Sequence, residues 1–145
     1  MRWPIYCWIF VFVAGHCAAQ GKTVKRPDAE AIVGEWKVTS FVEEGEITPP
    51  EKYRSMRYVS TDGKGSIKID GKVVAKFTLK LDSSKEPKQI DTELSEEHQI
   101  GIYKLDGDKL TLCARAYIDN GDRPTEFKSV KDSGLMLIEF ERIKK

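Results

Sequence analysis

The chain has 145 residues, with 24 Lys or Arg, 23 Asp or Glu and 40% hydrophobic residues, which fits one globular domain. A net charge near zero argues against nucleic acid or an anionic membrane as a partner, because both attract proteins with a basic excess. Two of the three cysteines, Cys7 and Cys17, lie in an N-terminal segment that we expect to be removed, which leaves Cys113 alone. The sequence therefore predicts no disulfide framework, and the hydrophobic core must hold the domain together.

The first nineteen residues are predicted to be a secretory signal peptide. A positive start at Arg2 precedes an apolar run over residues 4–15, and small residues lead to a cleavage point after Ala19, before Gln20. Two alternatives stay open, a leader that is retained as a membrane anchor and a lipid anchor at Cys17. Loss of Arg2 lowers the 24 basic residues to 23, equal to the 23 acidic ones. We expect a secreted or periplasmic protein, with no membrane attachment after cleavage.

The mature chain is expected to begin with a flexible lead over residues 20–27, followed by the folded domain over residues 28–145. The stretch RPDAEAIVG predicts a short helix, because Pro27 stands near its start, an acidic residue occupies the first turn at Asp28, and Gly34 can end it.

After Gly34 the hydrophobic period changes to two, which indicates β-strands. Trp36, Val38, Ser40 and Val42 share one predicted face, as do Val73, Ala75, Phe77, Leu79 and Leu81. Turn signals such as DG at 70–71 and LDGDK at 105–109 separate the strands. We predict eight strands, at about 35–43, 55–60, 65–70, 72–82, 87–94, 99–105, 109–116 and 135–142. Short meandering strands with one polar face are typical of a sandwich or an up-and-down barrel.

The segment GEW, with a Gly-x-Trp at the start of the first strand, resembles the lipocalin superfamily. That resemblance implies an all-β, eight-stranded antiparallel up-and-down barrel with a short N-terminal helix. It also implies that Trp36 plugs the closed end, beside the turn at Gly34, and that Arg142 from the last strand packs over it. A guanidinium over an indole adds a cation–π contact.

A closer resemblance covers residues 34–142. The segments GEWKVTSFVEEGE, KFTLKLDSSKEPKQID, GIYKLDGDKLTLC and RPTEF are similar to the uncharacterised lipocalin-like domain family of secreted planctomycete proteins. The resemblance implies a barrel and export, and it implies no activity. The segment at 95–103 departs from the family pattern, because it lacks glycines and extra length.

No catalytic or metal-binding constellation is evident in the sequence. His98, the only histidine after the leader, has no neighbouring nucleophile, and Cys113 has no second cysteine or adjacent cation to activate it. One histidine and one cysteine cannot build a zinc site, and the segment 119–122 lacks the spacing of a calcium loop. We therefore expect neither a cofactor nor an enzymatic activity.

The barrel interior is the predicted ligand site. An eight-stranded barrel is just wide enough to be filled by side chains or to hold one small ligand. We expect a monomer that binds a small apolar molecule, and the alternative is a solid barrel that acts as a protein-interaction module at the cell envelope. A further candidate is Arg123, in the loop before the last strand, either as a rim residue for a ligand's acidic group or as a staple of that loop. The predicted interior residues are Val38, Ser40, Val42, Ile67, Ile69, Ala75, Phe77, Leu79, Leu110, Leu112, Ala114, Met136, Ile138 and Phe140. Of these, the predicted ligand-binding residues are Val38, Ser40, Ala75, Phe77, Leu79, Leu112, Ala114 and Phe140.

Overall fold

The computed structural model describes residues 26–115 and 121–145. The predicted signal peptide and most of the predicted lead lie outside the described residues. The elements are α1 (Asp28–Ala31), β1 (Gly34–Glu43), β2 (Glu46–Ile47), the 3-10 turn η1 (Pro50–Lys52), β3 (Met56–Thr61), β4 (Lys64–Ile69), β5 (Lys72–Asp82), β6 (Lys88–Leu94), β7 (Glu97–Asp106), β8 (Lys109–Arg115) and β9 (Leu135–Arg142).

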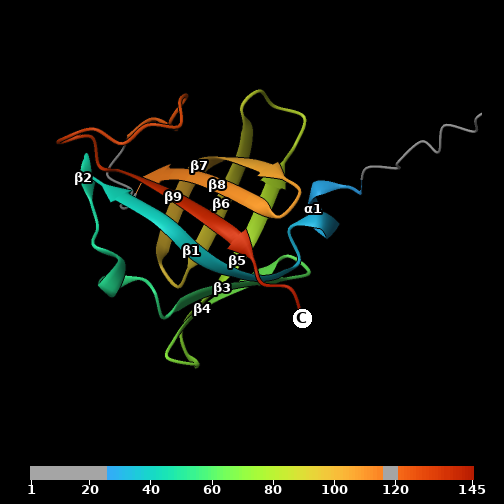
Figure 1. Cartoon of the computed structure of the whole chain (residues 1–145). Helices are drawn as coiled ribbons and strands as arrows, with labels where there is room; N and C mark the ends of the chain where they lie inside the picture. The colour runs from blue at the N-terminus through green and yellow to red at the C-terminus, as the bar shows by residue number, and fades with distance from the viewer. Residues whose placement is uncertain (1–25, 116–120) are drawn as a thin grey trace, which may run out of the picture.

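The strands form one sheet in which neighbours in sequence pair with one another, and a pairing of β1 with β9 closes the sheet into a barrel. All pairings are antiparallel, and β2 is a short extra strand on the end of β1. The predicted eight-stranded up-and-down barrel with a short N-terminal helix is confirmed. The eight predicted strands begin and end within two residues of the observed ones. In Figure 1, α1 lies at one end of the barrel and β2 at the other.

Tight hairpins follow directly from the turn residues. Asp70 and Gly71 connect β4 to β5 with positive φ angles of 51° and 79°. Two consecutive positive φ angles belong to the turn type whose twist matches that of the flanking strands, and Asp-Gly is a favoured pair for it. The DG signal in the sequence therefore fixes the position of this hairpin.

Two β-bulges shift the inward face of a strand by one residue. In β1, Val38 pairs with Phe140 but Ser40 pairs with Glu139, so Thr39 is the extra residue and Phe41 becomes the partner of Ile138. Because directly paired residues share a face, Phe41 points inward and Ser40 outward. The prediction that Ser40 faces the interior is therefore wrong.

The same shift affects Val42, which pairs with Leu137 on the outer face. In β5, Ile67 of β4 pairs with Ala75 but Lys68 pairs with Val73. Val73 and Val74 together oppose Lys68, and the prediction that Val73 shares the inward face of Ala75 is also wrong.

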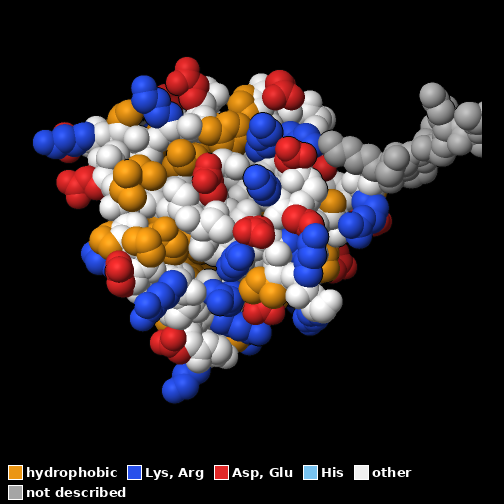
Figure 2. All heavy atoms as spheres, in the orientation of Figure 1, with side chains coloured by type: hydrophobic (Ala, Val, Ile, Leu, Met, Phe, Trp, Pro, Cys, Tyr) orange, Lys and Arg blue, Asp and Glu red, His pale blue; other side chains and the backbone are white. Residues whose placement is uncertain are grey.

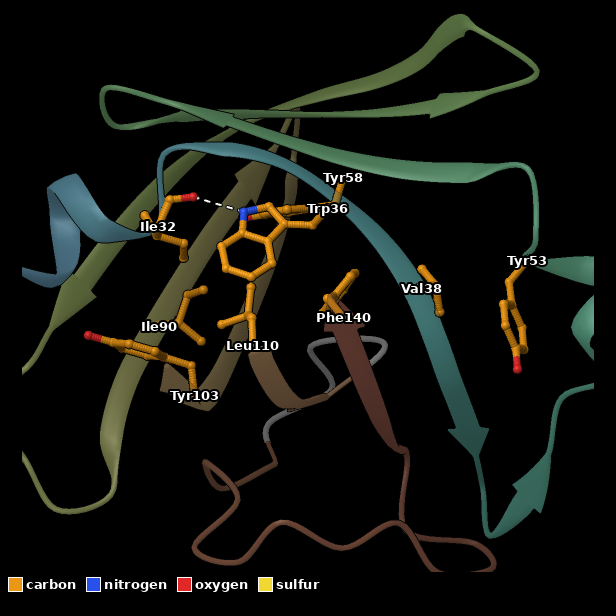
Figure 3. Close-up of a cluster of buried hydrophobic side chains, with 9 residues drawn as sticks. All are labelled: Ile32, Trp36, Val38, Tyr53, Tyr58, Ile90, Tyr103, Leu110 and Phe140. Atoms are coloured by element: carbon orange, nitrogen blue, oxygen red, sulfur yellow. Dashed lines mark hydrogen bonds between the residues drawn. The ribbon is translucent and has the colours of Figure 1, made fainter. Parts of the chain in front are cut away.

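The closed end of the barrel is built around Trp36. Its side chain is fully buried, and its indole Nε1 donates a hydrogen bond of 2.9 Å to the carbonyl oxygen of Ile32, as Figure 3 shows. Nine buried residues form the cluster drawn in that figure: Ile32, Trp36, Val38, Tyr53, Tyr58, Ile90, Tyr103, Leu110 and Phe140. The core is thus the barrel interior, sealed at one end by an aromatic plug.

Arg142 completes this plug. Its guanidinium carbon lies 4.2 Å from the centroid of the Trp36 ring, and the guanidinium donates hydrogen bonds to the carbonyl oxygens of Ala31 and Val33. Gly34 has a φ of +143°, and a Cβ placed there would lie 2.6 Å from Nη1 of Arg142. A side chain at this position would both strain the backbone and displace the guanidinium. The glycine in GEW is therefore required by the arginine that covers the tryptophan.

A buried carboxylate holds α1 against the barrel. Asp28 is 8% exposed and accepts hydrogen bonds from Lys88 Nζ at 2.6 Å and from the Tyr103 hydroxyl at 2.8 Å. Burial, and then the hydrogen bond to Asp28, raises the pKa of Tyr103 above its ordinary value. The charge-assisted contacts tie the helix to β6 and β7, so the closed end is sealed by polar as well as apolar contacts.

Candidate functional site

The candidate site is a cavity of about 120 Å³ in the half of the barrel away from Trp36. This half of the barrel contains the last residues of β1 and β8 and the first residues of β3 and β9. We call this end of the barrel the open end. The walls of the cavity come from β3 to β9, and most of its lining is apolar. The lining residues are Met56, Tyr58, Ile67, Phe77, Ile90, Thr92, Leu94, Gln99, Leu112, Met136, Ile138 and Phe140.

Three aromatic rings in contact with one another form part of the cavity wall. The ring of Tyr58 is stacked on that of Phe77 and tilted against that of Phe140, with centroids 5.5 Å apart in both pairs. Phe77 fits because Gly65 stands directly opposite it, and a Cβ on Gly65 would meet the Phe77 ring at 2.2 Å. The Phe77 ring therefore packs directly against the backbone of Gly65, where any side chain would displace it.

Polar groups occur at only a few points of the cavity wall. Thr92 and Gln99 are directly paired on β6 and β7, and the Thr92 hydroxyl donates a hydrogen bond of 3.4 Å to Gln99 Oε1. Tyr58 also lines the cavity, and its hydroxyl makes none of the hydrogen bonds found among the described residues. Burial raises the pKa of Tyr58 above its ordinary value, so this hydroxyl stays protonated at neutral pH.

The predicted interior residues take several positions. Phe77, Leu112 and Phe140 line the cavity. Val38 belongs to the buried cluster and Leu79 packs against it, so both fill the core instead of lining the cavity.

The two predicted alanines also lie outside the cavity lining. Ala75 pairs with Ile67 on the inward face of the β4–β5 hairpin. Ala114 is buried against Gly101, where a Cβ on the glycine would lie 2.9 Å from that of the alanine. The small side chain at 114 therefore allows β7 and β8 to approach each other closely.

Arg123 is engaged by the barrel wall. Its Nη1 lies 2.7 Å from Asp91 Oδ1, and it donates hydrogen bonds to the carbonyl oxygens of Ile90 at 3.2 Å and of Gly101 at 2.8 Å. Arg123 is not among the residues that line the cavity. Its contacts are those of a staple that ties the loop before β9 to β6 and β7.

Sequence reasoning missed half of the cavity wall. The side chains that close it on the β6 and β7 side, Ile90, Thr92, Leu94 and Gln99, were not among the predicted site residues. Their spacing of two was visible in the sequence as Ile90, Thr92 and Leu94. The polar Thr92 interrupts this apolar series, so the alternation of apolar and polar residues does not identify the inward face of β6.

The residues considered for catalysis are placed apart from the cavity. His98 is exposed, with Nδ1 3.6 Å from Glu93 Oε1. Cys113 is fully buried on the outer side of β8, where its Sγ lies 3.6 Å from the carbonyl oxygen of Lys128, and burial raises the pKa of its thiol. No group of three potential metal ligands occurs within residues 26–115 and 121–145.

Comparison of the chain with protein-family models, with curated proteins and with solved structures gave no match. The family resemblance of the GEW and RPTEF segments therefore stays a prediction.

Proposed function

We propose that this chain is an exported, lipocalin-like carrier that binds one small apolar molecule at the open end of its barrel. The observation that carries the proposal is the mostly apolar cavity of about 120 Å³, whose wall includes the three contacting aromatic rings. The Trp36–Arg142 plug supports the lipocalin-like part, and the sequence of residues 1–19 supports export. The proposal includes no reaction and no cofactor.

The size of the cavity limits the ligand. An apolar cavity of about 150 Å³ is known to accept benzene, whereas pockets for drug-sized ligands measure about 300–1,000 Å³. A cavity of about 120 Å³ is therefore close in size to one that holds a single small ring, and far too small for a drug-sized ligand. The ligand is either a small ring compound or the end of a longer molecule that extends through the open end.

The lining also limits the chemistry of the ligand. No Lys, Arg, Asp or Glu of the described residues lines the cavity, so a charged ligand group would be buried without a partner. Tyr58, Thr92 and Gln99 can exchange hydrogen bonds with a hydroxyl or carbonyl group. We therefore infer a neutral ligand that is mostly apolar and has one hydrogen-bonding group.

Toluene and phenol test this inference, because they have the same number of non-hydrogen atoms and phenol carries a hydroxyl where toluene carries a methyl group. Both should raise the midpoint of thermal unfolding, since a ligand bound only by the folded state stabilises it. Thr92→Val should lower the affinity for phenol by roughly fivefold to tenfold, because it removes one hydrogen bond, and should leave the affinity for toluene unchanged. Thr111→Val, on the outer face of β8, is the matched control and should change neither affinity.

The proposal fails if neither compound stabilises the protein at millimolar concentration. It also fails if Met136→Trp, which places a large ring in the cavity wall, leaves both affinities intact. Benzoate, which adds a negative charge to the ring, should not bind at the cavity.

A further inference from the structure

The near-zero net charge of the chain conceals one strongly basic segment. Residues 54–80, which include β3, β4 and most of β5, hold seven Lys or Arg and two Asp, for a net charge of +5. Because the 23 basic and 23 acidic residues after position 19 balance, the remainder of the chain carries the opposite excess. Net charge alone therefore says little about the partners of this protein.

The pairing register gathers these cations on one surface. Directly paired residues share a face, and the inward face of the same strands carries Tyr58, Ile67 and Phe77. Figure 2 shows Lys and Arg side chains over the lower part of the molecule, where Figure 1 places β3 and β4. We call this surface the basic face, and its cations are Arg57, Lys64, Lys68, Lys76 and Lys80.

Of the cations of the basic face, only Lys80 lies directly opposite an acidic residue, Asp91 of β6, and none of the five makes an ion pair within 4.0 Å with a described residue. In the part of the chain that the structure describes, every ion pair within 4.0 Å uses a different cation, namely Lys37, Lys88, His98, Arg123, Arg142 or Lys144. Arg57 and Lys68 are moreover directly opposite each other, an arrangement of like charges that destabilises a sheet. A concentration of uncompensated charge is the footprint expected where an anionic partner approaches.

Two exposed valines lie within this face. Val73 and Val74 are 46% and 57% exposed and oppose Lys68 at the bulge in β5. β6 pairs with β5 only from Thr78 onward, so these valines sit on the part of the β4–β5 hairpin that extends beyond β6. Figure 1 shows this hairpin projecting from the barrel. Two adjacent apolar side chains on a projecting tip, flanked by cations, form an amphipathic surface.

We propose that the basic face docks on a lipid surface that contains anionic headgroups, with Val73 and Val74 entering the interfacial region. The cations attract the phosphate groups of the lipids, and the valines are stabilised when they leave water for the apolar part of the interface. A purely polar partner offers no apolar surface that could bury the valines. Single-stranded nucleic acid fits less well, because the outer faces of β3, β4 and β5 carry no aromatic side chain on which bases could stack. The docking does not require a transmembrane segment, and no helix of the described residues is long and apolar enough to be one.

Co-sedimentation with vesicles tests the docking. The purified chain should bind vesicles of equimolar phosphatidylcholine and phosphatidylglycerol, and binding should weaken as salt is added. It should bind vesicles of phosphatidylcholine alone at least tenfold more weakly. Each cation near an anionic surface contributes about 1 kcal/mol, so Lys68→Glu with Lys76→Glu should reduce binding by at least about 30-fold. Far-UV circular dichroism checks that this double variant is folded.

Lys85→Glu with Lys104→Glu is the matched control. Both residues are exposed, neither is in an ion pair of the described residues, and both lie off the basic face, in the turn before β6 and on β7. The change in net charge is identical, so a comparable loss of binding in this control would overturn the assignment to one face.

The valines are tested apart from the charges. Val73→Ser with Val74→Ser should lower vesicle binding by about fivefold to tenfold and leave its salt dependence unchanged, because the cations remain. Equal binding to both vesicle types would overturn the electrostatic part of the proposal. Binding to single-stranded DNA without binding to either vesicle would replace the lipid surface by a nucleic acid. The proposed ligand cavity lies inside the barrel, so its own tests are independent of these outcomes.

Discussion

The contact between Trp36 and Arg142 allows a quantitative test of how the barrel is closed. Trp36→Ala removes a fully buried indole and its hydrogen bond to Ile32, and should lower the free energy of unfolding by about 3–5 kcal/mol. Arg142→Ala removes the cation above the ring and two hydrogen bonds to carbonyl oxygens of the helix end. A cation–π contact of about 1–2 kcal/mol and the lost charge-assisted hydrogen bonds together predict about 2–4 kcal/mol.

The double variant isolates the contact itself. If the guanidinium and the indole interact directly, the double variant should be about 1 kcal/mol more stable than the sum of the single effects predicts. Arg142→Lys should fall between wild type and Arg142→Ala, because an ammonium can sit over the ring but cannot hydrogen-bond both carbonyl oxygens with a planar fork. Urea unfolding followed by far-UV circular dichroism suits all of these proteins, since it does not depend on Trp36.

Lys144→Ala is a suitable control for the loss of a nearby cation. Lys144 contacts Asp108, as Arg142 does, but its side chain is 78% exposed, so its removal should leave the unfolding midpoint nearly unchanged. Effects of Trp36→Ala and Arg142→Ala that add within about 0.3 kcal/mol would refute the proposed coupling. A small effect of Trp36→Ala alone would refute the role of this residue as the plug.

Three further predictions concern the interior and the loop. Phe77→Ala should cost about 3–5 kcal/mol and enlarge the cavity enough to admit naphthalene, which calorimetry can measure; no loss of stability would contradict its place among the three contacting aromatic rings. Burial raises the pKa of Tyr58 and Tyr103, so their stabilising effect is complete below about pH 10 and is lost progressively above it. Urea midpoints should therefore begin to fall above about pH 10, and Tyr58→Phe with Tyr103→Phe should reduce that fall. Arg123→Ala should expose the loop before β9 to limited proteolysis without weakening ligand binding, and a selective loss of binding would instead indicate a rim role.

The strand order and the closed end could be predicted because they depend on local sequence signals. Alternation of apolar residues located each strand, and Asp-Gly pairs located hairpins whose turns require positive φ angles. Strands joined by short hairpins pair with their neighbours in sequence, which leaves few possible sheet topologies and favours a meander. The roles of Gly34 and Trp36 could be predicted because the Gly-x-Trp at the first strand resembles the lipocalin pattern. The structure adds the physical reason for the glycine, since a Cβ at Gly34 would meet the guanidinium of Arg142.

The bulges at Thr39 and Val74 could not be predicted, because an extra residue in one strand has no fixed sequence signature. Each bulge reverses the faces of the residues on one side of it, which moved Ser40 outward. The contacts of Arg123 were equally hidden, since Asp91 and Gly101 lie on strands that are distant in sequence and meet the loop only after the barrel has closed.

The β4–β5 hairpin links the two surfaces proposed here. Its inward face carries Ile67, which lines the cavity, and its outer face carries Lys68, Val73 and Val74. One bulge allows both arrangements, because it leaves Val73 and Val74 exposed on the outside while Ala75, Phe77 and Leu79 face the interior. A barrel that rests on anionic lipid through this hairpin would hold its open end near the bilayer, where neutral apolar molecules are concentrated. The variants of the basic face and those of the cavity wall can then be combined. Lys68→Glu should leave the uptake of phenol from solution unaffected. The same variant should slow the transfer of phenol from vesicles to the protein.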